Sequence, residues 1–263
     1  MIKCKLNLNL RNKNKVINQS DIIVTLTSFG SRCNKRLAIC LESLATQSIR
    51  PLAINCYLTY DDINNLCSDL IKLKSKYKFI YFIETDDYRS HKKYLPLLNS
   101  GYKGWFVTAD DDIYYPENWL ESLSQSKSKK YVAAVRCHRI TFTDSKPNHY
   151  IDWQYCINDS TTTDPNVFGT SGAGILFHTD YFKSINLNFD YISKHFLRCD
   201  DVYLYFAIRR NNLCYKKIIL KNLVELFDPE LEALNLNKFN MQPESHNDYS
   251  IKYIFSNNLI SRQ

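Results

Sequence analysis

The stretch WFVTADDDIYYP at residues 105–116 decides the fold. Its first five residues form a nearly continuous apolar run, which is typical of a strand buried on both faces of a parallel sheet. Three carboxylates, Asp110, Asp111 and Asp112, follow at once. Adjacent like charges repel, so the trio needs a cation or hydrogen-bond donors nearby. In an extended segment, Asp110 and Asp112 would point to one side of the strand and Asp111 to the other.

Strand and helix patterns alternate on the N-terminal side of this stretch. Strands are expected at residues 21–29, 53–59, 78–83 and 105–109, with helices at 33–48 and 61–73. This alternation predicts an α/β fold with a mostly parallel central sheet flanked by helices. Ligands of such sheets bind beyond the carboxyl ends of the strands. The segments that follow three of the strands should therefore converge on one crevice, namely residues 30–32, 84–87 and 110–112.

The acidic trio has two interpretations. Carboxylate oxygens are hard ligands that suit Mg²⁺ or Mn²⁺, with substrate phosphates completing the coordination shell. Alternatively, the trio is an acidic turn that caps the helix expected after Pro116, because Asp is favoured near helix N-termini. The position of the trio at the end of a buried strand favours the metal site.

Two motifs in the second half of the chain also suggest chemistry. Asp200 and Asp201 open a helix, where they either cap it or act in catalysis. Two adjacent carboxylates that are partly desolvated make a suitable general base, with Asp201 as the base and Asp200 orienting it or binding an acceptor. The motif GTSGAG at residues 169–174 is either a plain tight turn or a place where a substrate approaches the backbone. A strand at residues 131–135 and another at 175–178 flank these motifs.

Several cationic residues are weaker candidates. Arg32 follows the first strand, and His91, Lys92 and Lys93 follow the third. Each set would suit a pyrophosphate, although surface lysines and arginines are commonly just solvated. His246 is a candidate metal ligand late in the chain, where a lone histidine is more often not a ligand.

Composition limits the partners. Lys plus Arg number 34 and Asp plus Glu number 27, which gives a net charge of +7. This moderate charge suits an anionic substrate or surface, but no recognition-helix or aromatic RNA-binding motif accompanies it, so no nucleic acid partner is expected. Nine cysteines without a CxxC pair predict reduced thiols in a cytosolic protein rather than a zinc ribbon. The absence of a long apolar run and of a secretory signal also predicts a cytoplasmic protein.

Taken together, these motifs resemble GT-A fold (Rossmann-like) glycosyltransferases, most closely the family 2-like bacterial enzymes that build surface polysaccharides. The resemblance covers residues 21–212. It is carried by five segments in a fixed order: IIVTLTSFGSR at 22–32, LESLATQS at 41–48, DDDIYYPENW at 110–119, GAG at 172–174 and CDDVYL at 199–204. It implies one domain over residues 1–263, with a nucleotide-sugar-binding half at 21–135, an acceptor and catalytic half at 136–228 and a tail at 229–263.

The resemblance also implies roles for individual residues. Residues 110–112 are similar to the family's DxD motif. Asp110 would contact the donor ribose and also the metal, and Asp111 would contact the donor. Asp112 would hold the metal on the diphosphate. Asp201 matches the second acid of the family's ED motif, the base of inverting members, and Asp200 replaces its Glu. The remaining donor contacts would be Thr27, Phe29, Arg32, Glu84 and Lys93. The acceptor side would use Trp153, Gly172, Ala173 and Gly174, although core packing is the commoner role of a Trp.

The implied reaction is metal-dependent transfer of a sugar from a nucleotide diphosphate sugar, expected to be a UDP-sugar, to a glycan or lipid-linked saccharide, with inversion. The family's acceptor motif QxxRW and the membrane helices of processive synthases are missing, which favours a single-transfer enzyme. Work on a lipid-linked acceptor would place it peripherally at the inner face of the membrane. Two alternatives stay open: a sugar-phosphate nucleotidyltransferase, for which the loop at residues 30–36 is a partial match, and a non-catalytic carbohydrate-binding module.

Overall fold

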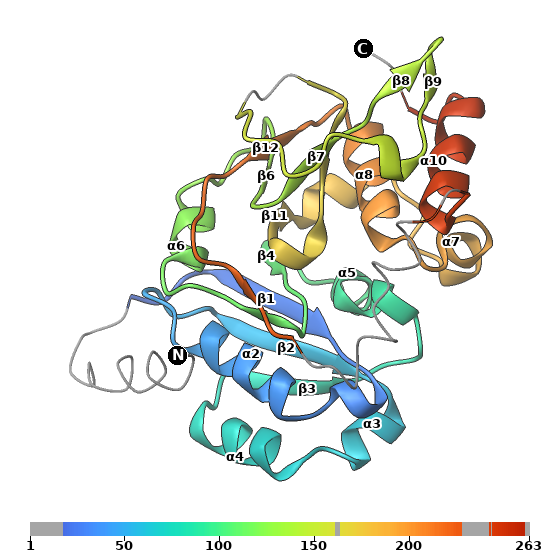
Figure 1. Ribbon diagram of the computed structural model, residues 1–263. Coiled ribbons are helices and arrows are strands. Elements are labelled where there is room, and N and C mark those ends of the chain that lie inside the picture. Colours follow the sequence, from blue (N-terminus) through green and yellow to red (C-terminus); the bar gives the residue numbers. More distant parts are fainter. Residues whose placement is uncertain (1–17, 161–163, 228–241, 243, 261–263) are drawn as a thin grey trace.

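A computed structural model describes residues 18–160, 164–227, 242 and 244–260. Its centre is a seven-stranded sheet with the strand order β12-β6-β11-β4-β1-β2-β3 (Figure 1). The strands are β1 (Ile22–Thr27), β2 (Ala53–Leu58), β3 (Ile80–Glu84), β4 (Trp105–Thr108), β6 (Val132–Ala134), β11 (Ile175–His178) and β12 (Tyr215–Lys217). Each expected strand is therefore present, and the α/β fold class is confirmed.

The sheet is parallel except at β11. β1 pairs in parallel with β2 and β4, β2 with β3, and β6 with β12, whereas β11 runs antiparallel to both β4 and β6. The carboxyl ends of the parallel strands therefore meet at one edge, and the residues that precede β11 come to this same edge. This reversal places the motif at residues 169–174 beside the residues that follow β4.

Helices cover both faces of the sheet (Figure 1). Side chains of a strand alternate between the two faces, so that Val24 of β1 packs with the residues of one layer and Ile23 with those of the other. The first layer holds α2 (Lys35–Ala45), α4 (Ser68–Lys76) and α6 (Trp119–Ser124). The second holds α5 (Leu95–Asn99), α7 (Phe189–Phe196), α8 (Asp200–Arg210) and α10 (His246–Ser256).

The helix expected over residues 61–73 is two helices, α3 (Tyr60–Asn64) and α4. Thr59 caps α3 reciprocally with Asp62, and the helix ends at Asn65. Two consecutive asparagines at 64 and 65 favour a turn, because their side chains compete for backbone hydrogen bonds. The apolar spacing alone did not reveal this break.

Smaller elements complete the fold. Three two-stranded sheets pair β5 (Ile113–Tyr114) with β13 (Val224–Glu225), β7 (Cys137–Arg139) with β10 (Val167–Gly169), and β8 (Phe142–Thr143) with β9 (Lys146–Pro147). The 3₁₀ helices are η1 (Gly30–Arg32), η2 (Arg89–Lys93), η3 (Tyr150–Asp152), η4 (Ser171–Ala173) and η5 (Thr179–Phe182). The expected tail at 229–263 includes α10, which packs on α7 and α8, while 228–241, 243 and 261–263 lie outside the described residues.

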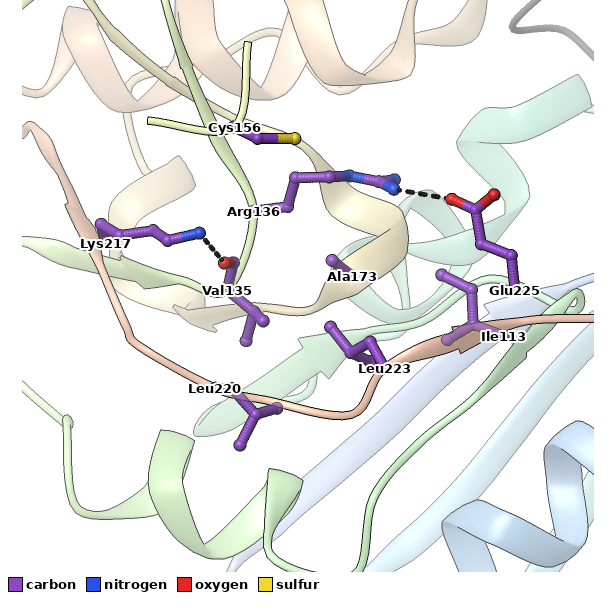
Figure 2. A pocket seen from close by; sticks show the side chains of 9 residues that line it. All are labelled: Ile113, Val135, Arg136, Cys156, Ala173, Lys217, Leu220, Leu223 and Glu225. Atoms are coloured by element: carbon purple, nitrogen blue, oxygen red, sulfur yellow. Dashed lines mark hydrogen bonds and ion pairs between the residues drawn. The ribbon is translucent and has the colours of Figure 1, made fainter. Parts of the chain in front are cut away.

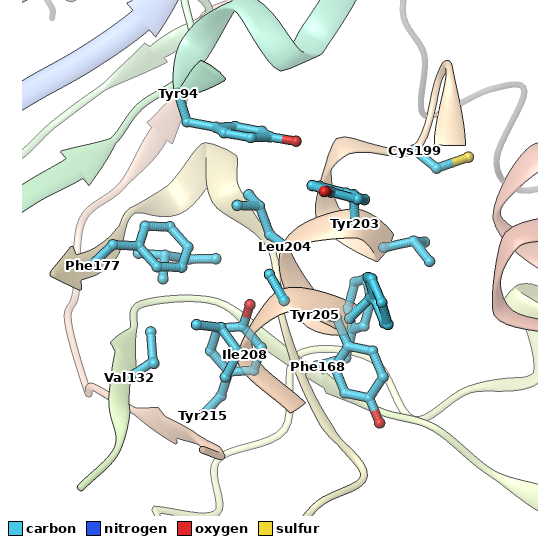
Figure 3. Packing of buried hydrophobic residues seen from close by; sticks show 14 of the residues in the cluster. Tyr94, Val132, Phe168, Phe177, Cys199, Tyr203, Leu204, Tyr205, Ile208 and Tyr215 are labelled. Carbon is cyan, nitrogen blue, oxygen red and sulfur yellow. The ribbon is translucent and has the colours of Figure 1, made fainter. Parts of the chain in front are cut away.

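The second layer is rich in aromatic side chains (Figure 3). Phe177 of β11 is fully buried and its ring stacks on Phe106 of β4 with a centroid distance of 5.3 Å. The same cluster includes Tyr203 and Tyr205 of α8 and Phe168 of β10. None of the described helices is long and apolar enough to cross a membrane.

Replacing Phe177 with alanine should strongly destabilise the fold. The change removes a buried ring from the face of the sheet, where it packs on Phe106 and Phe182, and such cavities cost about 3–5 kcal/mol of unfolding free energy. The matched control is Phe227→Ala, because Phe227 is 74% exposed and its loss should cost less than about 0.5 kcal/mol. Urea unfolding of both variants measures the difference. Equal losses would show that the aromatic layer does not carry the stability assigned to it.

Candidate functional site

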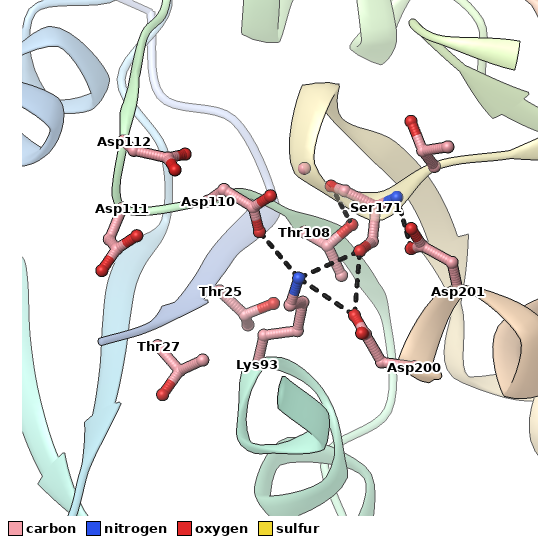
Figure 4. Close-up of polar contacts among 12 residues, drawn as sticks. Thr25, Thr27, Lys93, Thr108, Asp110, Asp111, Asp112, Ser171, Asp200 and Asp201 are labelled. Atoms are coloured by element: carbon pink, nitrogen blue, oxygen red, sulfur yellow. Dashed lines mark hydrogen bonds and ion pairs between the residues drawn. The ribbon is translucent and has the colours of Figure 1, made fainter. Parts of the chain in front are cut away.

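The acidic trio and the paired aspartates lie on either side of Lys93 at one edge of the sheet, and the region around these residues is called the crevice below (Figure 4). Asp110, Asp111 and Asp112 follow β4 at the carboxyl edge of the sheet, and η4 reaches the same edge just before β11. Asp200 and Asp201 form the first turn of α8. The topology therefore brings together three segments that are far apart in the sequence. Of the segments expected to converge, residues 30–32 meet the trio through Arg32, while no described hydrogen bond or ion pair joins residues 84–87 to it.

Lys93 connects the two acidic groups. Its ammonium Nζ lies 2.7 Å from Asp110 Oδ1 and 3.0 Å from Asp200 Oδ2, and it donates a hydrogen bond to Ser171 Oγ at 3.0 Å. The side chain is 7% exposed. Burial alone would lower the pKa of Lys93, but the carboxylates of Asp110, Asp200 and Asp201 outweigh it and hold this pKa above its usual value. Lys93 is thus a fixed cation between the two halves of the crevice.

Arg32 neutralises the other two members of the trio. Its guanidinium bonds to Asp111 through Nε and Nη2, and Nη2 lies 3.0 Å from Asp112 Oδ2. Ser28 Oγ donates to Asp111 at 2.5 Å. The expectation that Asp110 and Asp112 point to the same side is wrong. Residues 111 and 112 form a turn and not an extended strand. Asp111 and Asp112 therefore both bond to Arg32, while Asp110 points to Lys93.

The environments of Asp200 and Asp201 push their pKa values apart. Burial and the adjacent charge of Asp200 raise the pKa of Asp201 to about 7, although Lys93 and Ser171 oppose this. Burial also acts on Asp200, but the ammonium of Lys93 prevails and lowers the pKa of Asp200 to about 2. Asp201 Oδ1 accepts a hydrogen bond from the backbone N–H of Ser171 at 2.7 Å, which fixes its orientation. A pair divided in this way is a typical acid–base arrangement.

Gly172 must be glycine because its backbone lies against Asp110. A Cβ at this position would be 2.0 Å from Asp110 Oδ2. Tyr115 holds the two together, because its hydroxyl accepts from the Asp110 N–H at 2.8 Å and donates to the carbonyl of Gly172. Gly174 has a φ of +116° and a Cβ there would clash with Trp119, whose Nε1 donates to the carbonyl of Ala173 at 2.8 Å. The motif at residues 172–174 therefore supports the trio through backbone contacts.

The crevice contains more carboxyl groups than cationic side chains, so a divalent cation would balance its charge. Five carboxyl groups, of Asp110–Asp112 and of Asp200–Asp201, surround three cations, Lys93, Arg32 and Arg136. Burial, with the charges of Asp110 and Asp111, raises the pKa of Asp112 to about 6 despite Arg32. The described residues include no group of three His, Cys, Asp or Glu side chains placed to hold a metal. A magnesium-type site needs only one or two carboxylates plus substrate phosphates. Asp112 and Asp110 are the candidates, and in this structure Asp112 is paired with Arg32 and Asp110 with Lys93.

Other predicted site residues lie in different surroundings. Thr27 ends β1 and donates to the carbonyl of Tyr57, Phe29 is 44% exposed beneath the Arg32 guanidinium, and Glu84 is exposed at the end of the edge strand β3. No hydrogen bond or ion pair of the described residues joins Glu84 to the trio. His246 is exposed at the start of α10, and no described contact links it to Asp110 or Asp112.

Trp153 was expected on the acceptor side and this is wrong. It is 4% exposed, its ring packs against Tyr150 and Phe168, and its Nε1 donates to the carbonyl of Asn148. A ring enclosed in this way has no face left for a sugar. His91 is likewise fully buried, between Tyr94 and the carbonyl of Phe196, so it does not reach a pyrophosphate.

Sequence reasoning missed three polar residues of the crevice. Ser171 bonds to Lys93 and to both Asp200 and Asp201, and Ser28 bonds to Asp111. Arg136 lies near Asp110 and Asp201, whose charges outweigh burial and raise its pKa. The only signal for Arg136 was its place just after a strand, and Ser171 was visible only as a small residue of the glycine-rich turn.

Comparison with known proteins supports the fold. Neither a scan against protein-family models nor a search of curated proteins gives a match. The solved structure of 4-diphosphocytidyl-2C-methyl-D-erythritol synthase from Anaerococcus prevotii has a TM-score of 0.53 and 15% identity, covering 80% of this chain and 92% of that one. S. aureus TarS has a TM-score of 0.50 and 13% identity, covering 80% of this chain and 37% of that one. These likenesses confirm a GT-A-like, Rossmann-like α/β fold.

Asp201→Asn and Asp200→Asn should change stability in opposite directions. The ordinary carboxyl pKa is 3.8, so folded Asp201, at about 7, costs stability increasingly as pH rises from 3.8 to 7. Asparagine removes that cost, and the melting temperature should exceed that of the wild type more at pH 8 than at pH 5. Asp200, at about 2, stabilises the fold above pH 3.8 and loses this effect only as pH falls toward 2.

Asp200→Asn should therefore melt below the wild type at both pH 5 and pH 8. Thermal unfolding of the two variants at these pH values measures both effects. A lower melting temperature of Asp201→Asn at pH 8 would contradict the assigned division of charge between the two carboxyls.

Proposed function

We propose that the chain is a glycosyltransferase that moves a sugar from a nucleoside diphosphate sugar, of which a UDP-sugar is our first choice, to an acceptor hydroxyl. The observation that carries this proposal is geometric: Lys93 joins Asp110 of the acidic trio to Asp200, and the adjacent Asp201 is oriented by the backbone N–H of Ser171 at the same edge of the sheet. The trio suits the donor and the pair suits the acceptor. A glycan or lipid-linked saccharide of the bacterial surface is the acceptor class that the sequence resemblance favours.

The proposed transfer is a direct displacement. The acceptor oxygen forms a bond to the anomeric carbon as the bond from that carbon to the diphosphate oxygen breaks, and the acceptor proton passes to Asp201. Asp201 must be ionised to accept it, and its pKa of about 7 is well matched to a base that works near neutral pH. Asp200 stays ionised and, with Lys93, keeps the pair in place. One displacement inverts the anomeric centre.

A divalent ion, Mn²⁺ or Mg²⁺, fits the donor side of the crevice. Asp112 and Asp110 would hold it together with oxygens of the donor diphosphate. When bound, such an ion neutralises charge on the leaving diphosphate. Arg32 keeps Asp111 and Asp112 fixed for this purpose, because its guanidinium bonds to both.

A sugar-phosphate nucleotidyltransferase is the second candidate. The likeness to the Anaerococcus synthase is compatible with this function. A second compatible feature is Arg36, which lies at the start of α2, just after the loop that follows β1. Arg36 is 8% exposed, and its Nε and Nη2 have no hydrogen-bond partner in the described part of the chain. A buried guanidinium with free N–H groups suits a phosphate. Against this candidate, Arg32 of the same loop is already bonded to the acidic trio.

A donor screen distinguishes these functions. With Mn²⁺ present, the purified chain should release free nucleoside diphosphate from one member of a panel of nucleotide sugars, and chelation of the metal should abolish the release. Release of pyrophosphate from a nucleoside triphosphate and a sugar phosphate would instead establish the nucleotidyltransferase. Binding of a saccharide without either release would identify a carbohydrate-binding module.

Substitutions should separate donor binding from transfer. Asp201→Asn should leave nucleotide-sugar affinity within about twofold and reduce the transfer rate about 10²–10⁴-fold, because only proton transfer is lost. Asp112→Asn should instead weaken donor binding in the presence of Mn²⁺. Asp190→Asn is the matched control, since Asp190 is exposed in the first turn of α7. Calorimetry and turnover measure the two effects, and full activity of Asp201→Asn would exclude it as the base.

A further inference from the structure

A cavity of about 300 Å³ is lined by residues that neighbour the acidic trio and the turn at 172–174, among them Ile113, Arg136 and Ala173 (Figure 2). One part of its wall is apolar and includes Leu220 and Leu223. Another part carries two cations, Arg136 and Lys217, and the exposed thiol of Cys156 lies at its margin. A cavity that combines carbon surface with paired cations suits a ligand that carries both an apolar face and a negative charge.

Arg136 links this cavity to the reacting centre. Its Nη2 lies 3.3 Å from the position of a Cβ built on Gly172, and Asp110 Oδ2 lies 2.0 Å from the same position. The guanidinium Nε donates to Thr170 Oγ1 at 2.7 Å, which fixes the side chain. A group bound to the outer side of Arg136 is therefore close to Asp110 and to the turn that holds Asp201.

An exposed carboxylate of the chain itself already contacts Arg136. Glu225 of β13 places Oε1 3.3 Å from Arg136 Nη1, and its side chain is 80% exposed. Such exposed ion pairs contribute little to stability, so another anion can replace this one readily. Among the nine residues that line the cavity, Glu225 is the only carboxylate.

Lys217 provides the second cation. Its Nζ donates to the carbonyl of Val135 at 2.6 Å, which holds the ammonium at the wall and leaves two N–H groups for a ligand. Arg136 and Lys217 come from the segments that follow β6 and end β12, two parallel neighbours in the sheet. The two charges are thus positioned by the sheet rather than by a loose surface loop.

We propose that this cavity is the acceptor subsite and that it binds an oxyanion of the acceptor, a carboxylate or a phosphate, which replaces Glu225 on Arg136. The proposal rests on the proposed glycosyltransferase function and adds that the acceptor is acidic. The acceptor's anion would bind to Arg136 in the place of Glu225, and its carbon skeleton would pack on Leu223 and Leu220, with Lys217 as a second cation of the same cavity. The hydroxyl to be glycosylated would then lie toward Asp201.

The thiol of Cys156 reports occupancy of the cavity without any turnover. The chain is treated with the neutral reagent iodoacetamide, and mass spectrometry of the Cys156 peptide measures the rate of alkylation. The rate is compared in the presence of glucuronate, of glycerol 1-phosphate and of glucose, which is the uncharged match for glucuronate. Ionic strength is held constant with sodium chloride, and Cys67, outside the cavity, is the internal reference. We expect the anions to slow alkylation of Cys156 and glucose to leave it unchanged. The stronger protector shows whether carboxylate or phosphate is preferred.

Two variants test the assignment in opposite directions. Arg136→Gln should raise the concentration of anion needed to protect Cys156 about tenfold, which corresponds to the loss of one charge-assisted hydrogen bond. Glu225→Gln should strengthen binding of that anion, because the competing carboxylate is gone, and the loss of an exposed ion pair should change stability little. Equal protection by glucose, or protection that neither substitution alters, would overturn the proposal. Because no donor is present, the assay stays informative even if the donor screen shows no glycosyl transfer.

Discussion

The ion pairs of Lys93 with Asp110 and Asp200 connect the parts of this molecule on which the site depends. Lys93 belongs to η2, after β3, while its partners follow β4 and open α8. A buried ammonium is tolerated only if its charge is matched, and a buried carboxylate has the same requirement. Each of the three groups therefore depends on the other two for charge balance, and this fixes the distance between the acidic trio and the aspartate pair.

The remaining charge is unevenly divided, and this gives the crevice its chemistry. Asp111 and Asp200 are each bonded to a cation and to a hydroxyl, while Asp112 and Asp201 have pKa values raised to about 6 and about 7. One group of each acidic cluster is thus left able to exchange its proton near neutral pH. Under the proposed function, a metal cation would bind at Asp112 and the acceptor proton would pass to Asp201.

Much of the fold could be predicted from the sequence, because buried parallel strands are apolar throughout and the acidic segments follow them directly. The meeting of residues 30–32 with the trio came from the same argument and is confirmed by the bonds of Arg32. Lys93 was predicted as a donor contact, but its ion pairs with Asp110 and Asp200 could not be predicted, because a sequence shows that a cation follows a strand but not what it faces. Arg136 was missed for the same reason. Trp153 was misplaced for a related reason: an aromatic residue has the same pattern in a core as on a rim.

The reversal of β11 has a consequence for how such a chain can diversify. The chain leaves the sheet after β6 and returns at β11, and because these strands are antiparallel it departs and re-enters at the same edge. The described parts of this excursion, residues 135–160 and 164–174, include Arg136, Cys156 and the turn around Gly172. Changes to its exposed residues would alter the surroundings of Asp110 and Asp201 and leave the strand register untouched.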